Sequence, residues 1–421
     1  MNTRMRQLKI LRITLLVLLV LITIVVLILT RKTKNEKQII WFDQFTWPVT
    51  EYPISSAEEN QGLIPVQSGD LYGFINHSGE LTIPFTYYGA KPFSEGLAPV
   101  VTEISTDVYG WGFINTSNEM VISPDYAEAG MFSDGLAKVG TYTADNRLVY
   151  GYIDSNGTMV ISPEYDQAGD FSDGLAMVAR KDGTGALKYG YINTAGEFII
   201  PLEYDAASGF SEGFAKIGKK NYENEMRYAF ADTTGNFITR FDYVGAGDFS
   251  EGMAAVATQY GKGSAMWGFI DTTGELVILP SWTRVTSFSE GMAVIIYTDQ
   301  YGNWYHALID KTGKKVLTFE HDTQINEFEH GFARSGILRG DVKFGVINTL
   351  GELVIPHEYN NVRIYKHNLV VTAEKHIYYG LLTTENESVL PAKYHHIEPV
   401  DNLVFVRKKE KTGVFIYNSQ D

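Results

Sequence analysis

The chain has 421 residues, 44% of them hydrophobic and 20% charged, which is the composition of a folded protein with room for two or three domains or one large array. It contains no cysteine, which excludes disulfides, thiolate metal sites and thiol catalysis. Its formal net charge of −15 argues against general nucleic-acid binding, because an acidic surface repels phosphate.

An apolar segment lies near the start of the chain. After a basic leader, residues 1–12, the stretch ITLLVLLVLITIVVLILT (13–30) carries no charge. Eighteen helical residues span roughly 27 Å, close to the thickness of a bilayer core. Arg31, Lys32 and Lys34 follow it, and no small-residue cleavage site is present, so we expect an uncleaved signal-anchor helix. The short leader and the large acidic body favour a body outside the cytoplasm.

Residues 31–60 are expected to form a linker. Its aromatic residues, including Trp41 and Trp47, fit two interpretations. They can rest on the membrane interface, where amphipathic rings settle, or they can cap the first unit of the folded body.

A short sequence box then recurs along the chain. Successive copies such as PFSEGLAPV (92–100) and MFSDGLAKV (131–139) place their glycines 39 residues apart, and a weaker copy, EFEHGFARS (327–335), follows. The regularly spaced glycines are Gly96, Gly135, Gly174, Gly213, Gly252 and Gly291. A period of 20–50 residues is typical of solenoids, propellers and arrays.

A second marker recurs in phase, as in YGFIN (72–76) and WGFID (267–271), and leads into a turn and a third apolar run. In residues 174–201 these parts read as three strands joined by short turns, with Pro201 expected to end the third strand. The sequence thus predicts an all-β domain over residues 61–421, with degenerate C-terminal copies. Its tandem repeats of about 39 residues are three-stranded β-meanders that close into a propeller or run as an open superhelical array.

The F-S-[DE]-G box is interpreted as a turn in which Phe enters the core and Gly takes a special backbone conformation. Residues 209–213, GFSEG, also fit the G-x-S-x-G elbow of serine hydrolases, but only this copy has glycine before the phenylalanine. The acids of the box are either solvated turn residues or a ring of carboxylates for cations or a basic partner. They are Glu95, Asp134, Asp173, Glu212, Glu251 and Glu290.

The loop before each Y-G or W-G marker is where the copies differ most. Repeat arrays often vary on their binding face, so these loops are the first place to expect a ligand. Four aromatic residues in them are candidates for stacking on a sugar or a side chain, or for strand-end packing: Tyr142, Tyr222, Tyr260 and Tyr301.

The combination YGFIN…GELTIP…FSEGLAPV resembles the WG-repeat family, over roughly 350 residues. The resemblance implies a mostly bacterial, often exported or membrane-tethered protein that binds or scaffolds rather than catalyses. We expect a membrane partner through residues 13–30 and a protein or cell-envelope glycan ligand, with no cofactor, metal or catalytic residue.

Two alternatives stay open at this point. Eight of the nine histidines follow residue 300, and the adjacent pair His395 and His396 is the best candidate for a hydrolytic or metal-dependent site on the C-terminal repeats. The other alternative is a purely structural spacer.

Overall fold

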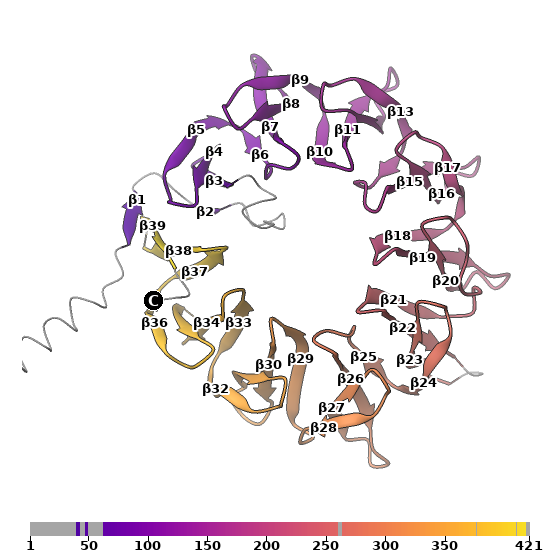
Figure 1. Ribbon diagram of the computed structural model, residues 1–421, viewed down its shortest axis with the longest axis vertical. Coiled ribbons are helices and arrows are strands. Elements are labelled where there is room, and N and C mark those ends of the chain that lie inside the picture. Colours follow the sequence, from indigo (N-terminus) through magenta and orange to yellow (C-terminus); the bar gives the residue numbers. More distant parts are fainter. Residues whose placement is uncertain are drawn as a thin grey trace, which may run out of the picture.

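The computed structural model describes residues 39–42, 47–48, 62–259, 263–375, 377–409 and 411–417. Within these ranges the chain forms strands and turns and no helix, which confirms the all-β prediction. Ten small antiparallel sheets stand like blades around a common centre (Figure 1). The repeats therefore close into a ten-bladed propeller rather than an open superhelix.

The leader and the predicted membrane helix, residues 13–30, lie outside the described residues. In the part of the chain that the structure describes, no helix is long and apolar enough to cross a membrane.

We number the blades 1 to 10 in chain order and name their strands A to D from the centre outward. Blade 1 contains β2 (Trp47–Pro48), β3 (Leu63–Ser68), β4 (Leu71–Asn76) and β5 (Leu81–Tyr87), and blade 2 contains β6 (Gly89–Ala90), β7 (Leu97–Ser105), β8 (Val108–Asn115) and β9 (Met120–Tyr126). Blade 3 contains β10 (Glu128–Ser133), β11 (Leu136–Tyr142), β12 (Leu148–Ile153) and β13 (Met159–Tyr165), and blade 4 contains β14 (Gln167–Ala168), β15 (Leu175–Lys181), β16 (Leu187–Asn193) and β17 (Phe198–Tyr204). Blade 5 contains β18 (Ala206–Ser211), β19 (Phe214–Lys220) and β20 (Met226–Asp232).

Blade 6 contains β21 (Gly245–Ser250), β22 (Met253–Thr258), β23 (Met266–Asp271) and β24 (Leu276–Trp282), and blade 7 contains β25 (Arg284–Val285), β26 (Met292–Thr298), β27 (Trp304–Asp310) and β28 (Lys315–Thr318). Blade 8 contains β29 (Thr323–Glu329), β30 (Phe332–Ile337), β31 (Lys343–Asn348) and β32 (Leu353–Tyr359), and blade 9 contains β33 (Asn361–Tyr365), β34 (Leu369–Glu374), β35 (Tyr378–Thr383) and β36 (Ser388–Tyr394). Blade 10 contains β37 (His396–Val400), β38 (Leu403–Lys408), β39 (Lys411–Ile416) and β1 (Ile40–Phe42).

The prediction of three strands per repeat is wrong for nine of the ten described sheets, which have four. The additional strand is strand A, which runs into the F-S-[DE]-G box. It is only two residues long in several blades, such as Gly89–Ala90, and in others a register shift interrupts it, as between Ala129 and Phe132. A short or bulged strand lacks the alternation of apolar residues by which strands are found in a sequence.

The turns follow from their residue types, as predicted. In blade 4 the Asn193 Oδ1 accepts the backbone N–H groups of Ala195 and Glu197 at 3.0 and 2.9 Å, and Gly196 takes a φ of 81°. At the box, Asp173 and Gly174 both have positive φ, 55° and 78°. Positive φ at both central residues of a two-residue loop defines the hairpin turn that matches strand twist.

The expectation that Pro201 ends its strand is wrong. Strand β17 continues through Pro201 to Tyr204. Tyr189 pairs with Tyr204 and Tyr191 pairs with Ile200, so the outer strand bulges at the proline. Proline is tolerated there because β17 is an edge strand whose bulge needs no N–H for the ladder.

The hydrophobic core lies between blades rather than within them, as the repeat prediction required. One cluster joins Leu136 and Tyr152 of blade 3 to Phe171, Ala176 and Val178 of blade 4. The box phenylalanine is buried in most copies, and the alanine of each box is fully or almost fully buried, which lets neighbouring blades approach closely.

The ring is closed by the two ends of the described chain. Strand β1 pairs with β39, Ile40 opposite Val414, and so supplies strand D of blade 10. Figure 1 shows β1 beside β39, next to blade 1. The junction between blades 1 and 10 is filled by a core cluster, as the other blade interfaces are. The cluster contains Ile64 and Val66 of blade 1 and Leu403 and Phe405 of blade 10. Residues 40–42, part of the predicted linker, are thus a strand of the ring.

Candidate functional site

Four of the six serines of the F-S-[DE]-G boxes connect neighbouring blades through hydrogen bonds. The Ser211 Oγ donates a hydrogen bond to the Phe249 carbonyl of the next blade at 2.9 Å, and Ser250 does the same to Phe288 at 2.7 Å. Ser211 is the last residue of strand β18 and leads into a β-hairpin, whereas a hydrolase elbow presents its serine in a strand-to-helix turn. The resemblance of residues 209–213 to such an elbow is confined to the sequence.

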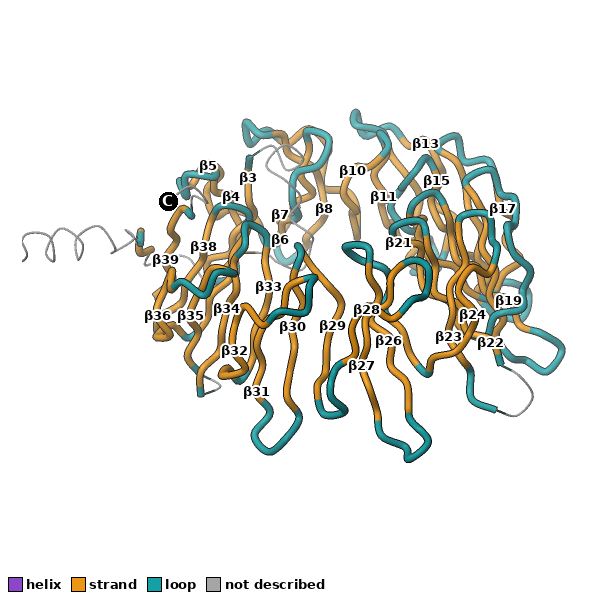
Figure 2. Tube along the Cα trace, turned by 60° about the horizontal axis from the view of Figure 1, so that its bottom comes forward, coloured by secondary structure: helices purple, strands orange, loops and turns teal. Residues whose placement is uncertain are grey.

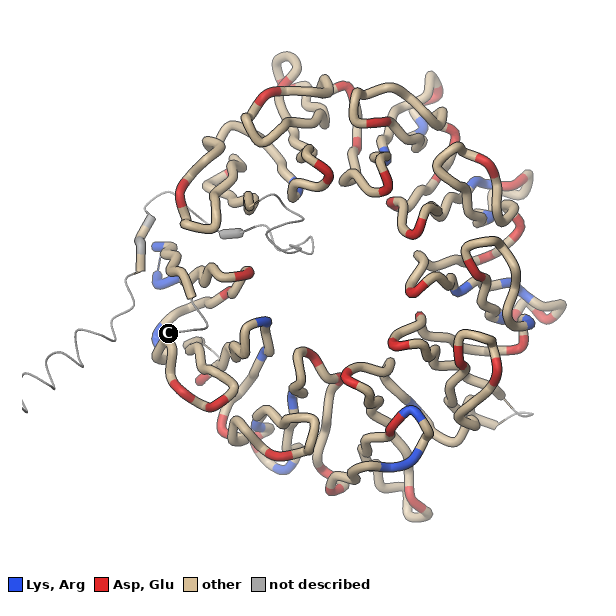
Figure 3. Tube along the Cα trace, in the orientation of Figure 1, with Lys and Arg blue, Asp and Glu red and all other residues tan. Residues whose placement is uncertain are grey.

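The acids of the box also reach the next blade. Five of the six accept the backbone N–H of the glycine one repeat later, which satisfies a donor in a tight turn. These bonds run from Gly135 to Glu95 (3.1 Å), Gly174 to Asp134 (2.9 Å), Gly252 to Glu212 (2.8 Å), Gly291 to Glu251 (2.9 Å) and Gly331 to Glu290 (3.2 Å). Of the six predicted acids, all described, Asp173 is the one that forms no such bond. Acidic positions recur at the inner ends of most blades (Figure 3).

The variable loops join strands B and C of each blade. The loops between β26 and β27 and between β30 and β31 protrude from one face of the ring (Figure 2). The F-S-[DE]-G turns and the turns between strands C and D lie at the opposite ends of the same strands, so they occupy the other face.

The predicted tyrosines lie on these loops or at their strand ends. Tyr142, Tyr222 and Tyr301 each expose more than half of their surface, so they are not strand-end packing residues. Each stands on a different blade, and Tyr260 lies outside the described residues.

The C-terminal histidines have separate local partners. The His395 Nδ1 accepts the Lys409 backbone N–H at 3.0 Å, His396 Nε2 lies 3.4 Å from Glu398 Oε2, and His357 Nε2 lies 2.8 Å from Ser335 Oγ. Burial lowers the pKa of His357. Among the described residues, no three His, Asp or Glu side chains come together in a group that could hold a metal ion; His376 is not described.

A pocket of about 300 Å³ between the inner strands of blades 8 and 9 was not foreseen from the sequence. Its residues are Asn326, Glu327, Glu329, Arg334, Val362, Arg363, Ile364 and Tyr365. The available signal was a departure from the repeat, because Glu329 replaces the box serine and Arg363 stands where the aligned blade 4 has Gly169.

Solved structures offer distant likenesses. The crystal structure of the eukaryotic initiation factor is 14% identical, covers 70% of this chain and 86% of its own, and superposes with a TM-score of 0.46. The tricorn protease is 11% identical over 88% of this chain and 46% of its own, with a TM-score of 0.25. The WD40 beta propeller domain of Doa1 is 13% identical over 61% and 95%, with a TM-score of 0.26. Such values say nothing about the activity of this chain.

Among proteins with curated functions, none matches this chain significantly. The family described as "WG containing repeat" matches seven segments: residues 72–103, 111–140, 150–183, 189–222, 228–262, 267–301 and 344–372. Each segment begins at the Y-G or W-G marker of strand C or its variant, and together they cover more than half of the sequence. The chain therefore belongs to the WG-repeat family.

Proposed function

We propose that this protein is a membrane-anchored, non-enzymatic binding or scaffolding protein that holds its propeller outside the cytoplasm, in a bacterial cell envelope. The ligand is a protein or an envelope glycan. The proposal rests above all on three exposed tyrosines at one face of a closed ring: Tyr142 at the end of β11, and Tyr222 and Tyr301 on the loops. Exposed aromatic rings are costly to leave in water and are enriched where proteins bind partners.

The anchor rests on the apolar stretch 13–30 and the basic residues beside it. Only residues 31–39 separate that stretch from β1, which begins at Ile40. Nine residues reach at most about 30 Å when extended. A spanning helix therefore tethers blade 10 close to the bilayer surface.

The test is a binding assay with the full-length chain and a variant that carries Tyr142→Ser, Tyr222→Ser and Tyr301→Ser. We expect the wild-type chain to retain envelope glycans or a specific protein from membrane extracts, and the triple variant to lose at least tenfold in affinity. The matched control is Leu350→Ser, because Leu350 is highly exposed in a turn on the opposite face. If the triple variant binds as tightly as the wild type, the variable loops are not the binding face. If the wild-type chain retains no partner, the result favours the alternative that the protein is a purely structural spacer.

A further inference from the structure

Arg334 lacks the acidic partner that its position has in other blades. The equivalent residues Lys138 and Lys216 pair with an aspartate of the next blade: Lys138 Nζ lies 3.6 Å from Asp170 Oδ1, and Lys216 Nζ lies 3.2 Å from Asp248 Oδ1. In blade 9 the corresponding position is Ile364. The cation that strand B supplies is therefore left without this counter-ion in blade 8.

The surroundings of Arg334 provide no substitute. Its Cζ lies 3.7 Å from the centroid of the Phe344 ring. No described carboxylate comes within ion-pair distance, and its Nε is buried without a hydrogen-bond partner. Burial and the nearby charge of Arg363 lower the pKa of Arg334. A buried donor without an acceptor destabilises the protein unless a ligand supplies one.

Arg363 lines the pocket from β33, but its side chain lies on the other face of that strand. Arg363 pairs with Val371, which packs against blade 10, whereas the neighbouring Val362 packs against blade 8.

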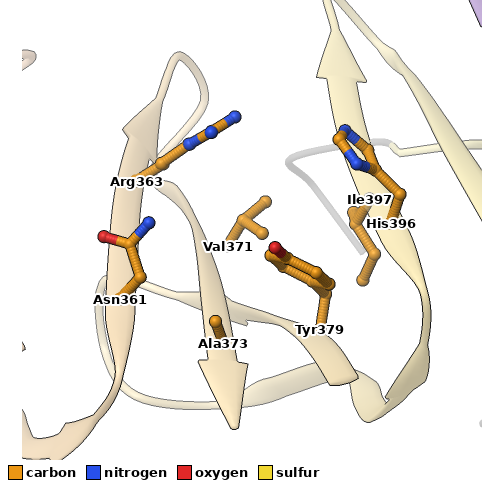
Figure 4. Close-up of a pocket in the computed structure, with 7 residues that line it drawn as sticks. All are labelled: Asn361, Arg363, Val371, Ala373, Tyr379, His396 and Ile397. Carbon is orange, nitrogen blue, oxygen red and sulfur yellow. The ribbon is translucent and has the colours of Figure 1, made fainter. Parts of the chain in front are cut away.

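Arg363 also lines a narrower neighbouring pocket of about 10 Å³ with Tyr379 and His396, toward which its side chain extends in Figure 4. A hydrogen bond with Tyr365 raises the pKa of Arg363, and the Tyr365 hydroxyl lies 3.4 Å from both carboxylate oxygens of Glu398. Arg363 is thus held in place on one side. Planar guanidinium groups bind carboxylates through paired hydrogen bonds.

Two acidic side chains line the same pocket. Glu327 and Glu329 belong to β29, and neither lies within ion-pair distance of a described cation. Burial and the nearby charge of Glu329 raise the pKa of Glu327. The two carboxylates therefore repel each other and disfavour a ligand of purely negative charge, whereas an ammonium group relieves the repulsion.

We propose that this pocket binds a small zwitterion of the α-amino acid class. Arg334 receives its carboxylate, and Glu327 and Glu329 receive its ammonium group. A volume of about 300 Å³ accommodates such a molecule. The site is separate from the protruding loops and does not depend on their function.

Isothermal titration calorimetry on the full-length chain tests the proposal, with the twenty standard α-amino acids as ligands. Acetate, methylammonium and inorganic phosphate serve as probes of the separate charges. We expect at least one amino acid to bind with a Kd of about 1 mM or tighter, and each probe to bind at least tenfold more weakly.

Variants then locate the site. Arg334→Met should weaken amino-acid binding at least tenfold, and so should Glu327→Gln, a conservative change at an exposed side chain. The control is Arg284→Met, because Arg284 is an exposed arginine on the inner strand β25 of blade 7, outside the pocket. Absence of any amino-acid binding, phosphate or acetate binding as tight as that of the best amino acid, or binding unchanged by both pocket variants would overturn the proposal.

Discussion

The glycine of the Y-G and W-G markers is required by the backbone opposite it. A Cβ on Gly190 would lie 2.5 Å from the Ile200 carbonyl oxygen and 2.8 Å from Pro201, on the bulged outer strand. Where the marker carries alanine instead, at Ala229 and Ala307, the outer segment of the blade contains no proline and follows a different course. The glycine of strand C and the proline of strand D therefore occur together, because the bulged outer strand leaves no room for a Cβ in strand C.

Gly190→Ala should lower the free energy of unfolding by about 1–3 kcal/mol, because the new methyl group meets backbone atoms that have no room to move. Denaturant unfolding of the full-length chain measures it. Gly183→Ala is the control, since a Cβ at Gly183 meets nothing within 4 Å and its φ is not positive. Equal destabilisation by both substitutions would contradict the steric account.

At the scale of the elements, the turn between strands A and B connects neighbouring blades from blade 2 to blade 8, except between blades 4 and 5. In blade 6, the Glu251 carboxylate accepts the Gly291 N–H at 2.9 Å and pairs with Lys311 at 3.2 Å. Burial alone would raise the pKa of Glu251, but these hydrogen bonds outweigh it and hold the pKa below its ordinary 4.5. A lowered folded-state pKa means that the stabilisation is present above pH 4.5 and is lost as the pH falls through the folded-state value.

Glu251→Gln should therefore destabilise the ring by roughly 1 kcal/mol at pH 7, since a charge-assisted hydrogen bond is replaced by a neutral one. The difference from wild type should shrink as the pH falls below 4.5. Thermal unfolding at a series of pH values measures this difference in stability. The control is Glu223→Gln, because Glu223 lies in an exposed turn of blade 5. A difference that stays constant down to pH 3 would show that the carboxylate charge plays no part.

At the scale of the whole molecule, closure depends on residues from both ends of the chain. Strand β1 completes blade 10, and the His77 Nδ1 of blade 1 lies 3.1 Å from Asp401 Oδ2 of blade 10. An unpaired edge strand is prone to pairing with other chains. Strand β1 therefore covers the β39 edge of blade 10, and the contact between blades 1 and 10 buries apolar faces that an open array would expose at its two ends.

Removal of residues 1–42 should lower the unfolding midpoint by several degrees and promote self-association, because β39 becomes a free edge. Removal of residues 1–37 is the matched control, since it leaves β1 in place. Light scattering and thermal unfolding compare the two chains. If both remain monomeric with the same midpoint, β1 does not close the ring.

Much of the fold was predictable because its signals are local. Asn193 and Gly196 mark a turn through contacts at most four residues apart, and the box phenylalanines recur at a fixed period, so turns, repeat length and the core between blades follow from the sequence. The short strand A was missed because two residues such as Gly89–Ala90 carry no alternation. The continuation of β17 through Pro201 was missed because the bulge depends on Gly190 in another strand.

The sequence by itself determined an all-β array of repeats, with the polar and apolar positions of each unit. Only the tertiary structure decided that ten blades close, because closure depends on a small rotation between neighbours that accumulates around the ring, and on the pairing of Ile40 with Val414 across almost the whole chain. The same holds for Arg334 and Arg363, which are 29 positions apart in the sequence and line one pocket because consecutive blades pack side by side.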